Sequence, residues 1–200
     1  MNHLKDLQLA KSADRLLNHG PTTLVTFEHA GVRNVMAASW AMPLDFDPPK
    51  VLLVLDGSTF SRPLLEGSGS FVLNLPSRLQ AELTLAVGSC SGSEGDKFAR
   101  FGIGEARARV VQAPIVPGCL AYLECRVIQE PHIQQRYDLF IAEVVAAYAD
   151  ERAFSNGRWH FPDEELRTIH YSGGGTFYPT GTPFTLTAAP FNPTEQPKGD

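Results

Sequence analysis

The sequence predicts a mainly β fold, a closed or nearly closed β-barrel with short helical inserts. Segments rich in β-branched and aromatic residues recur along the chain, several of them with the alternation typical of strands. The helical patterns between them are short, whereas a doubly wound parallel sheet needs longer and more regular crossover helices. The 200 residues show no internal repeat and no clear linker before about residue 170, which suits one barrel.

The first expected elements are a helix and a β-hairpin. Apolar side chains recur at helical spacing over residues 4–17, and Gly20-Pro21 ends that pattern. Residues 22–28 are β-branched and aromatic, and a similar run covers residues 32–40. Because only the short break His29-Ala30-Gly31 separates the two runs, they predict a β-hairpin.

The middle of the chain predicts strands separated by short helices. After the break at Asp47-Pro48-Pro49, residues 50–56 are nearly all apolar and predict a strand buried on both faces. Residues 59–67 predict a short helix, with Ser58 or Thr59 placed to cap its first turn. A fourth strand and a second short helix are expected at residues 71–75 and 77–87.

The C-terminal half predicts loops and two long strands. Small and polar residues predict a loop at 88–95, and a helical turn is expected at 97–101. Residues 110–119 carry two prolines and are expected to wrap over the surface. Long β-rich runs predict strands at 120–129 and 137–148. The last 30 residues hold Gly173-Gly174-Gly175 and five prolines, so we expect a loop-like tail.

Composition and charge exclude several classes of protein. The formal net charge of −5 argues against a nucleic-acid partner, which would need concentrated Lys and Arg. No apolar run approaches the roughly 20 residues needed to cross a bilayer, and the charged first 20 residues do not resemble a signal peptide. Three cysteines without C-x-x-C spacing predict neither a disulfide scaffold nor a zinc cluster. We therefore expect a cytoplasmic globular protein without a membrane partner.

Familiar catalytic and nucleotide-binding motifs are missing from the sequence. It contains no G-x-S-x-G elbow, and the loop at 88–95 lacks the Gly-Lys-Ser/Thr that closes a P-loop. Gly102-Ile103-Gly104 is followed by charged residues, which excludes a dinucleotide-binding fingerprint. The six histidines are dispersed, so no metal site is predicted. No side chain is singled out as catalytic.

Small hydroxyl and amide residues gather instead at the ends of the predicted strands. A phosphate group needs several N–H and O–H donors and a cation, which a helix start beside Ser58, Thr59 and Arg62 provides. A flat ring needs apolar walls and an accessible main chain, which the small residues Ala37 and Ala38 offer. The pattern predicts a phosphorylated planar ligand. The other members of this set are Asn34, Ser39, Trp40, Asn74, Ser89, Cys90, Ser91, Gly92, Asp96, Lys97 and Phe98.

Each of these residues alone also has an ordinary structural explanation. Ser58 and Thr59 are good helix caps, and Asn74 is a frequent turn residue. Lys97 is a charge that solvent can accommodate. Only the set taken together favours a ligand.

Several segments carry a resemblance to a known family. They are NVMAASWAMPLDFDPPKVLLVL (34–55), STFSRPLLEGSGSFVLNLP (58–76), SGSEGDKF (91–98), YDLFIAEVV (137–145) and, more weakly, HYSGGGTFYPTG (170–181). In this order they resemble the flavin-reductase-like family of FMN-binding split barrels, in particular its flavoredoxin-type branch. The resemblance implies a Greek-key-like split barrel of six strands over residues 1–181, followed by an extended or partly disordered proline-rich tail at 182–200. It also implies a homodimer that binds FMN non-covalently near the subunit interface.

The same resemblance implies which residues hold the cofactor. The isoalloxazine edge would be lined, largely through backbone groups, by Asn34, Ala37, Ala38, Ser39 and Trp40. The phosphate or ribityl chain would contact Ser58, Thr59 and Arg62. Asn74 and Leu75 would lie beside the flavin, and the pocket would be closed by Ser91, Gly92, Lys97 and Phe98. A cation such as Lys97 near the flavin would raise its reduction potential.

The sequence departs from the family pattern at two places. Members that use NADH to reduce free flavin often carry Gly-Asp-His where this chain has Tyr137-Asp138-Leu139. Leu139 cannot do what that histidine does for the nicotinamide, so the sequence favours FMN kept as a bound prosthetic group. Asp138 has either a functional or a structural role. Where the family has a strand end rich in Ser and Thr, this chain has Ala37-Ala38-Ser39. More of the hydrogen bonds to the ligand must therefore come from the main chain.

Two functions from different classes follow. The first is an oxidoreductase, in which FMN passes hydride or electrons from NADH, NADPH or a protein donor to a small-molecule or protein acceptor. The second is a non-catalytic module that stores, shuttles or senses flavin. A barrel that binds another planar ligand such as haem is disfavoured, because haem iron needs an axial ligand and the pocket motifs offer no histidine and one cysteine, Cys90.

Overall fold

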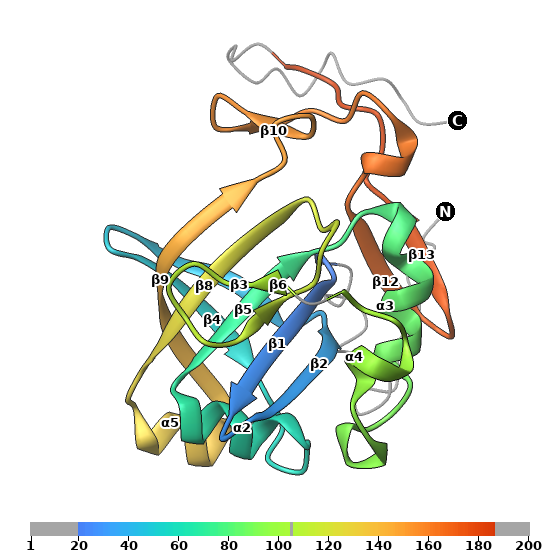
Figure 1. Cartoon of the computed structure of the whole chain (residues 1–200). Helices are drawn as coiled ribbons and strands as arrows, with labels where there is room; N and C mark the ends of the chain where they lie inside the picture. The colour runs from blue at the N-terminus through green and yellow to red at the C-terminus, as the bar shows by residue number, and fades with distance from the viewer. Residues whose placement is uncertain (1–19, 105, 187–200) are drawn as a thin grey trace, which may run out of the picture.

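A seven-stranded antiparallel sheet dominates the computed structural model, which describes residues 20–104 and 106–186 (Figure 1). Its strand order is β2-β1-β5-β8-β9-β4-β3. The strands are β1 (Thr23–His29), β2 (Val32–Ala38), β3 (Ala41–Phe46), β4 (Pro49–Val54), β5 (Ser70–Leu75), β8 (Ala121–Ile128) and β9 (Leu139–Ala149). The predicted mainly β fold is confirmed. The helix expected at 4–17 and the tail beyond residue 186 lie outside the described residues.

The connection between β2 and β3 explains why the sheet is rolled up. These strands are the two edges of the sheet, yet only Ser39 and Trp40 separate them in the chain. A flat sheet of this many strands is about 29 Å wide, whereas so short a connection spans at most about 11 Å. The edges must therefore come together. The main-chain N–H of Val54 donates to the carbonyl of Trp40 at 3.0 Å and fixes this corner to β4.

Two apolar clusters hold the barrel and its helices together. The larger cluster fills the barrel, with Phe27, Leu53 and Phe71 among its fully buried side chains. The smaller lies on the other side of β1 and β2 and includes Leu24 and Val35. Strand β1 contributes alternate residues to both clusters and is buried along most of its length. Strand β1 is therefore buried on both faces.

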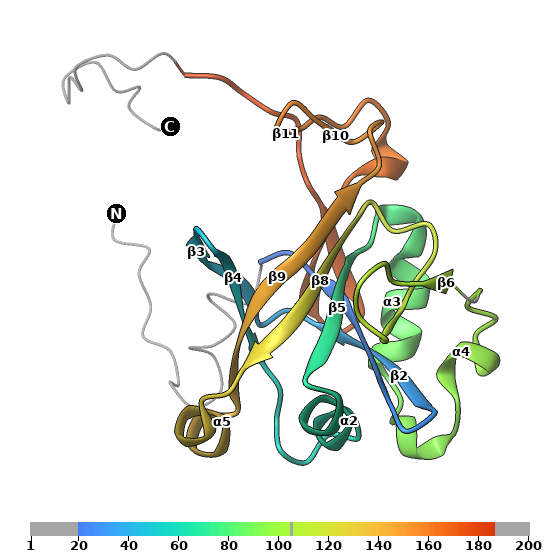
Figure 2. The same cartoon turned by 60° about the vertical axis from the view of Figure 1, so that its left-hand side comes forward.

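The short helices occupy two places around the barrel. They are α2 (Ser61–Ser68), α3 (Ala81–Gly88), α4 (Lys97–Arg100) and α5 (Pro131–Tyr137). Helices α2 and α5 lie at one end of the barrel, and α3 and α4 lie beside β2 (Figure 2). A capping box between Ser77 and Gln80 begins the 3₁₀ turn η2 (Arg78–Gln80), which leads into α3. This arrangement puts the C-terminal end of α3 next to the barrel edge.

Three predictions near these elements need correction. Strand β4 pairs with β3 on one side and β9 on the other. Leu52 and Val54, on one of its faces, are only half-buried, so the strand is not buried on both faces as predicted. Helix α2 begins at Ser61 with Phe60 as its N-cap and no side-chain cap, because Ser58 and Thr59 bond to Asp56 instead. Residue 137, expected in a strand, ends helix α5. Strand β3 and helix α5 were not predicted as separate elements.

The expected loop-like tail contains a β-hairpin. Strands β12 (Ile169–Gly173) and β13 (Thr176–Pro179) pair across a turn in which Gly173, Gly174 and Gly175 all have positive φ. Glycine adopts this conformation without a steric penalty, so the three glycines that suggested a loop form the turn. The hairpin is docked on the barrel through Thr22, whose N–H donates to the Ile169 carbonyl at 2.9 Å.

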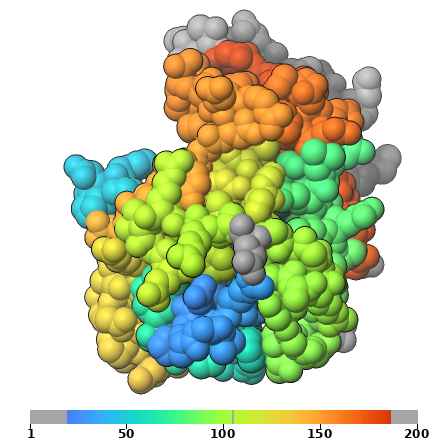
Figure 3. Space-filling view, viewed as in Figure 1, coloured from blue at the N-terminus to red at the C-terminus, as the bar shows by residue number. Residues whose placement is uncertain are grey.

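The segment before β8 covers one outer face of the barrel (Figure 3). It contains the two-residue strands β6 (Ala106–Arg107) and β7 (Pro114–Ile115). Fully buried Glu124 accepts main-chain N–H bonds from residues 109–111 at 2.6 to 3.0 Å and holds the segment in place. Beyond β9 the chain forms β10 (Phe154–Ser155), β11 (Arg158–Trp159) and the 3₁₀ turn η4 (Glu164–Leu166). None of the helices in the described ranges is long and apolar enough to cross a membrane.

Candidate functional site

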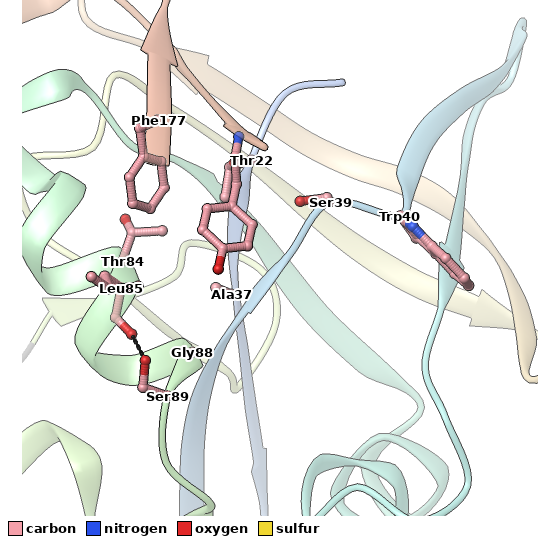
Figure 4. Close-up of a pocket in the computed structure, with 10 residues that line it drawn as sticks. Thr22, Ala37, Ser39, Trp40, Thr84, Leu85, Gly88, Ser89 and Phe177 are labelled. Atoms are coloured by element: carbon pink, nitrogen blue, oxygen red, sulfur yellow. Dashed lines mark hydrogen bonds between the residues drawn. The ribbon is translucent and has the colours of Figure 1, made fainter. Parts of the chain in front are cut away.

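Two adjoining cavities lie between β2 and the C-terminal end of α3, and they share Ala37, Gly88 and Ser89. The polar cavity, of about 400 Å³, is further lined by Asn34, Met36, Ser58, Thr59, Phe60, Ser61, Val87, Cys90, Ser91, Gly92, Glu94 and Lys97. The aromatic cavity, of about 330 Å³, is further lined by Thr22, Ser39, Trp40, Thr84, Leu85, Tyr171 and Phe177 (Figure 4). Each volume falls in the range of small-molecule sites.

Small residues allow α3 and β2 to approach one another at the boundary of the two cavities. A Cβ added to Gly88 would lie 3.1 Å from the Cβ of Ala37, which is tighter than ordinary contact. The absence of larger side chains leaves main-chain atoms accessible there. A planar ligand can therefore lie close to the backbone of β2.

Asn34 is a buried amide with an unused acceptor. Its side chain is 2% exposed, and its Nδ2 donates to Ser61 Oγ at 2.8 Å. Its Oδ1 has no hydrogen-bond partner. A Cβ at Gly92 would lie 2.7 Å from this Oδ1 and 2.3 Å from the Phe60 ring, so only glycine fits there. A buried acceptor without a donor is costly, which makes Oδ1 a place where a ligand donor is expected.

Lys97 places a buried cation in the same cavity. Its residue is 3% exposed, and its Nζ donates to the Val87 carbonyl at 2.7 Å. Within the described part of the chain the ammonium forms no ion pair, which leaves N–H donors without a charged acceptor. Burial lowers the pKa of Lys97 below its ordinary value. An anionic ligand would offset that desolvation.

The loop after α3 is held rigid by its own hydrogen bonds. In the 3₁₀ turn η3 (Gly92–Glu94), the Ser91 hydroxyl accepts from the Ser93 N–H, and Glu94 accepts from the Ser91 N–H at 2.9 Å. Asp96 caps α4 and pairs with Arg33 at 2.9 Å. These contacts fix Gly92 and Lys97 at the cavity wall. Binding there requires little ordering of the loop.

Ser58 and Thr59 line the polar cavity with their donors already engaged. The Ser58 hydroxyl donates to Asp56 Oδ1 at 2.6 Å, and the Thr59 hydroxyl donates to the Asp56 carbonyl at 2.8 Å. Each hydroxyl oxygen keeps a lone pair for a ligand donor. A ligand phosphate would have to take its hydrogen bonds from other groups or displace these.

The aromatic cavity has no charged side chain in its lining within the described residues. Trp40, Tyr171 and Phe177 supply aromatic walls, and Figure 4 shows Phe177 reaching from β13 toward Thr84 and Leu85 on α3. The hairpin is positioned by the Tyr171 N–H, which donates to Thr22 Oγ1 at 2.9 Å. Such a lining suits a neutral planar ring.

Most of the predicted site residues meet in these cavities. They are Asn34, Ala37, Ser39, Trp40, Ser58, Thr59, Ser91, Gly92 and Lys97. Ala38 lines neither cavity and packs inside the barrel. Phe98 is 1% exposed and packs in the smaller apolar cluster, with the Arg33 guanidinium over its ring. Leu75 lines neither cavity.

Arg62 is a structural residue in this molecule. Its guanidinium donates to Glu66 and Asp138 and to the carbonyls of Leu55 and Gln134, at 2.6 to 2.7 Å. It joins α2 to the end of β4 and to the turn between α5 and β9. Arg62 lines neither cavity and Asp138 is one of its partners, so the geometry does not support the predicted phosphate contact.

Asn74 is also a structural residue. It is fully buried, and its Nδ2 donates to the Leu24 carbonyl at 2.8 Å. Its Oδ1 accepts from the Val116 N–H at 2.8 Å. The amide anchors the segment before β8 to the sheet, and Asn74 lines neither cavity, so the geometry does not support its predicted place beside the flavin.

Sequence reasoning missed the residues that α3 and the C-terminal hairpin contribute, namely Thr84, Leu85, Gly88, Tyr171 and Phe177. It also missed Thr22, which lies just before β1. Tyr171 and Phe177 lie within the segment HYSGGGTFYPTG, so the aromatic spacing there was a usable signal. The end of α3 has no comparable pattern. Its place in the site follows only from the packing of α3 on β2.

Comparison with known proteins adds independent findings. The family model described as "Flavin reductase like domain" matches residues 16–171 of the chain. The chain is 46% identical over 172 residues to the uncharacterized protein YddH of Escherichia coli (strain K12), covering 84% of this chain and 91% of that protein.

Solved structures show the same architecture. An FMN-binding domain of a flavin reductases-like enzyme from Shewanella baltica OS155 has a TM-score of 0.81 at 45% identity, covering 90% of this chain and 96% of that one. Flavoredoxin of Desulfovibrio vulgaris (Miyazaki F) has a TM-score of 0.71 at 24% identity, covering 88% and 93%. The second likeness concerns the fold alone.

Proposed function

The chain belongs to the flavin reductase-like domain family, and on that premise we propose that it binds FMN and passes hydride or electrons through it. The donor would be NADH, NADPH or a reduced protein, and the acceptor a small molecule or a protein. The Shewanella baltica relative, described as FMN-binding, supports the choice of flavin. When bound, FMN supplies the redox chemistry, and the protein supplies position and electrostatics.

The observation that carries this proposal is that Lys97 and Asn34 line the same polar cavity. Lys97 is a buried cation without a carboxylate partner in the described chain, and Asn34 Oδ1 is a buried acceptor without a donor. A ligand that satisfies both must carry a negative charge and a hydroxyl or N–H group. The phosphate and the ribityl hydroxyls of FMN meet this requirement.

The neighbouring aromatic cavity suits the other end of the same ligand. Its uncharged lining and three aromatic residues match the flat isoalloxazine ring, and its contact with the polar cavity through Ala37 matches a continuous molecule. Lys97 would hold the phosphate, and Trp40, Tyr171 and Phe177 would wall the ring. The main chain of β2 would supply hydrogen bonds to the ring edge.

We also propose that the functional unit is a homodimer. Trp40, at the corner before β3, and three side chains of β3 are large, apolar and exposed; we call them the β3 strip, namely Trp40 at 53%, Met42 at 58%, Leu44 at 46% and Phe46 at 99%. Exposed apolar side chains gathered along one edge strand usually mark a protein interface. Because Trp40 also lines the aromatic cavity, a second copy seated on the strip would lie beside the ring site.

A titration and a turnover assay test the proposed activity together. We expect purified protein to bind one FMN per chain, with the absorbance bands of oxidised flavin, and to oxidise NADH or NADPH when given a ferric, quinone or flavin acceptor. Binding without turnover with any of these donors and acceptors, or with a reduced ferredoxin, would favour the flavin-storing or flavin-sensing module. Failure to bind FMN would refute both functions.

A further inference from the structure

Cys90 is the one cysteine of this chain that a reagent can reach. It lines the polar cavity and is half-buried, whereas Cys119 and Cys125 are 5% and 0% exposed in the apolar clusters. Its Sγ lies 3.5 Å from the Ala86 carbonyl at the end of α3, a weak contact for a thiol. Burial raises the pKa of the Cys119 and Cys125 thiols to about 12, so those two stay protonated and unreactive.

Two further groups in the polar cavity indicate that an anionic or hydrogen-bonding ligand enters beside this thiol. Asn34 Oδ1, in a side chain 2% exposed, has no partner. Lys97 and Cys90 line the same cavity, and the Lys97 ammonium is held there by the Val87 carbonyl at 2.7 Å. An ammonium attracts anions and holds the negative charge of a thiolate or of its oxidised form.

We propose that Cys90 is a peroxide-reactive thiol, and that its oxidation and the binding of FMN exclude one another. The reactivity of the thiol stands on the cavity alone, and the exclusion rests on the proposed function. An oxygen atom added to Cys90 would occupy space in the polar cavity and place a hydrogen-bonding group where the FMN phosphate would reach Lys97. FMN in the cavity would in turn shield the sulfur.

The chemical step requires hydrogen peroxide as the oxidant. The Cys90 thiolate attacks one peroxide oxygen, the S–O bond forms, and the O–O bond breaks. The leaving hydroxide takes a proton and becomes water. The sulfur is oxidised by two electrons to the sulfenic acid, and the peroxide is reduced by two. A thiol reductant reverses the change through a disulfide.

Thiol labelling tests accessibility and protection. Iodoacetamide is added to FMN-free and FMN-saturated protein, and each cysteine is followed by peptide mass spectrometry. We expect Cys90 in the FMN-free protein to react at least about tenfold faster than Cys119 and Cys125, and FMN to slow it at least about tenfold. Equal rates for the three cysteines would overturn the claim of a reactive thiol. Saturation with FMN without any slowing would overturn the exclusion.

Peroxide treatment tests the consequence. Dimedone, which traps sulfenic acids, is expected to mark Cys90, and the FMN affinity of treated protein is expected to fall at least about tenfold and to recover with dithiothreitol. The matched control is Cys90→Ser. The ratio of affinities before and after peroxide is compared in each protein, so that any effect of the substitution itself cancels. An unchanged ratio in the native protein, or an equal fall in the variant, would overturn the proposal.

These experiments separate the two proposals. If untreated protein binds no FMN, the proposed function fails, and the labelling rates and the dimedone adduct still decide whether Cys90 is a reactive thiol. If FMN binds and Cys90 stays inert, the proposed function stands and the inference about Cys90 is wrong.

Discussion

In the proposed FMN site, Lys97 is the residue expected to distinguish a ligand that carries a phosphate from one that does not. Replacing it with glutamine removes the only buried cation of the polar cavity in the described chain. We expect FMN affinity to fall by about 1.5–3 kcal/mol, the size of a charge-assisted hydrogen bond, and riboflavin affinity to stay nearly unchanged because riboflavin lacks the phosphate. Calorimetric titration with both ligands measures this difference.

The matched control for Lys97→Gln is Lys50→Gln. Lys50 pairs with Asp45 on the β3–β4 hairpin and lines neither cavity, so its loss should leave both affinities unchanged. An equal loss of FMN and riboflavin binding in Lys97→Gln would mean that Lys97 supports the ring site or the fold instead of the phosphate.

The pKa of Lys97 predicts how FMN binding depends on pH. Burial lowers this pKa below its ordinary value, and only the protonated ammonium attracts phosphate. As pH rises through the lowered pKa, the free protein loses the charge, so FMN affinity should fall in a range where an exposed lysine would still be protonated. Riboflavin affinity and the affinity of Lys97→Gln for FMN should lack this fall. Titrations from neutral to alkaline pH measure it, and parallel pH profiles for FMN and riboflavin would contradict the phosphate assignment.

Replacing Arg62 with alanine is expected to lower the stability of the fold without removing a contact to the ligand. Arg62→Ala leaves the carbonyls of Leu55 and Gln134 without their donor and removes the link between α2 and β9. Because Asp138 and Glu66 are partly exposed, the ion pairs add less than a buried pair would. We expect the free energy of unfolding to fall by about 2–4 kcal/mol, measured by urea denaturation. FMN affinity of the folded protein should change little, and a large selective loss would restore a role for Arg62 at the cofactor.

At the scale of elements, the β12–β13 hairpin should decide how well the ring is held. Phe177→Ala removes an aromatic wall of the aromatic cavity without touching the polar cavity. We therefore expect FMN and riboflavin to lose affinity equally, by roughly 1–3 kcal/mol, since both carry the same ring. Phe161→Ala, in the aromatic group near β11, is the control and should change neither affinity. Loss of FMN binding alone would contradict the placement of the ring.

Local patterns predicted most strands because each strand carries its own signal. The runs around β1, β2, β5 and β8 alternate or are rich in β-branched residues, and the structure confirms them. Helix α5 was missed because its seven residues, PHIQQRY, show no apolar period. Strand β3 was not predicted, because the expected run ends at Trp40 and β3 follows after only a two-residue corner. The β12–β13 hairpin was missed because glycines at a turn and glycines in a loop look alike in sequence.

Residue types predicted the site less well than the strands. Alternation along β2 does not predict which of its residues reach the site, because Asn34 and Met36 share the face of Ala38 and line the polar cavity, whereas Ala38 packs in the barrel. Arg62 and Asn74 have the chemistry of ligand contacts, but main-chain groups from distant segments use it. Nothing in a single sequence shows which buried polar group is already satisfied. That information appears only with the fold.

At the scale of the whole molecule, the roll of the sheet connects the site with an interface. Closing the barrel through Ser39 and Trp40 puts the proposed ring site at the corner where β3 begins, and β3 runs away from that corner (Figure 2). The exposed apolar side chains of the β3 strip lie along it. The strip would be unfavourable in water if nothing covered it. A second copy of the chain would cover it and also restrict solvent access to Trp40. Dimer formation and flavin binding should therefore be coupled.

That coupling gives a last prediction. Replacing Met42 and Phe46 with serine removes two apolar side chains of the strip, 58% and 99% exposed, without touching either cavity. We expect sedimentation velocity to show a dimer for the native protein and a monomer for this variant, and the monomer to bind FMN more weakly because the ring site loses its cover. Leu79→Ser, an equally exposed apolar position at 63% on η2, should remain dimeric with native affinity. A native protein that sediments as a monomer, or a monomeric variant with full FMN affinity, would show that one chain holds the flavin alone.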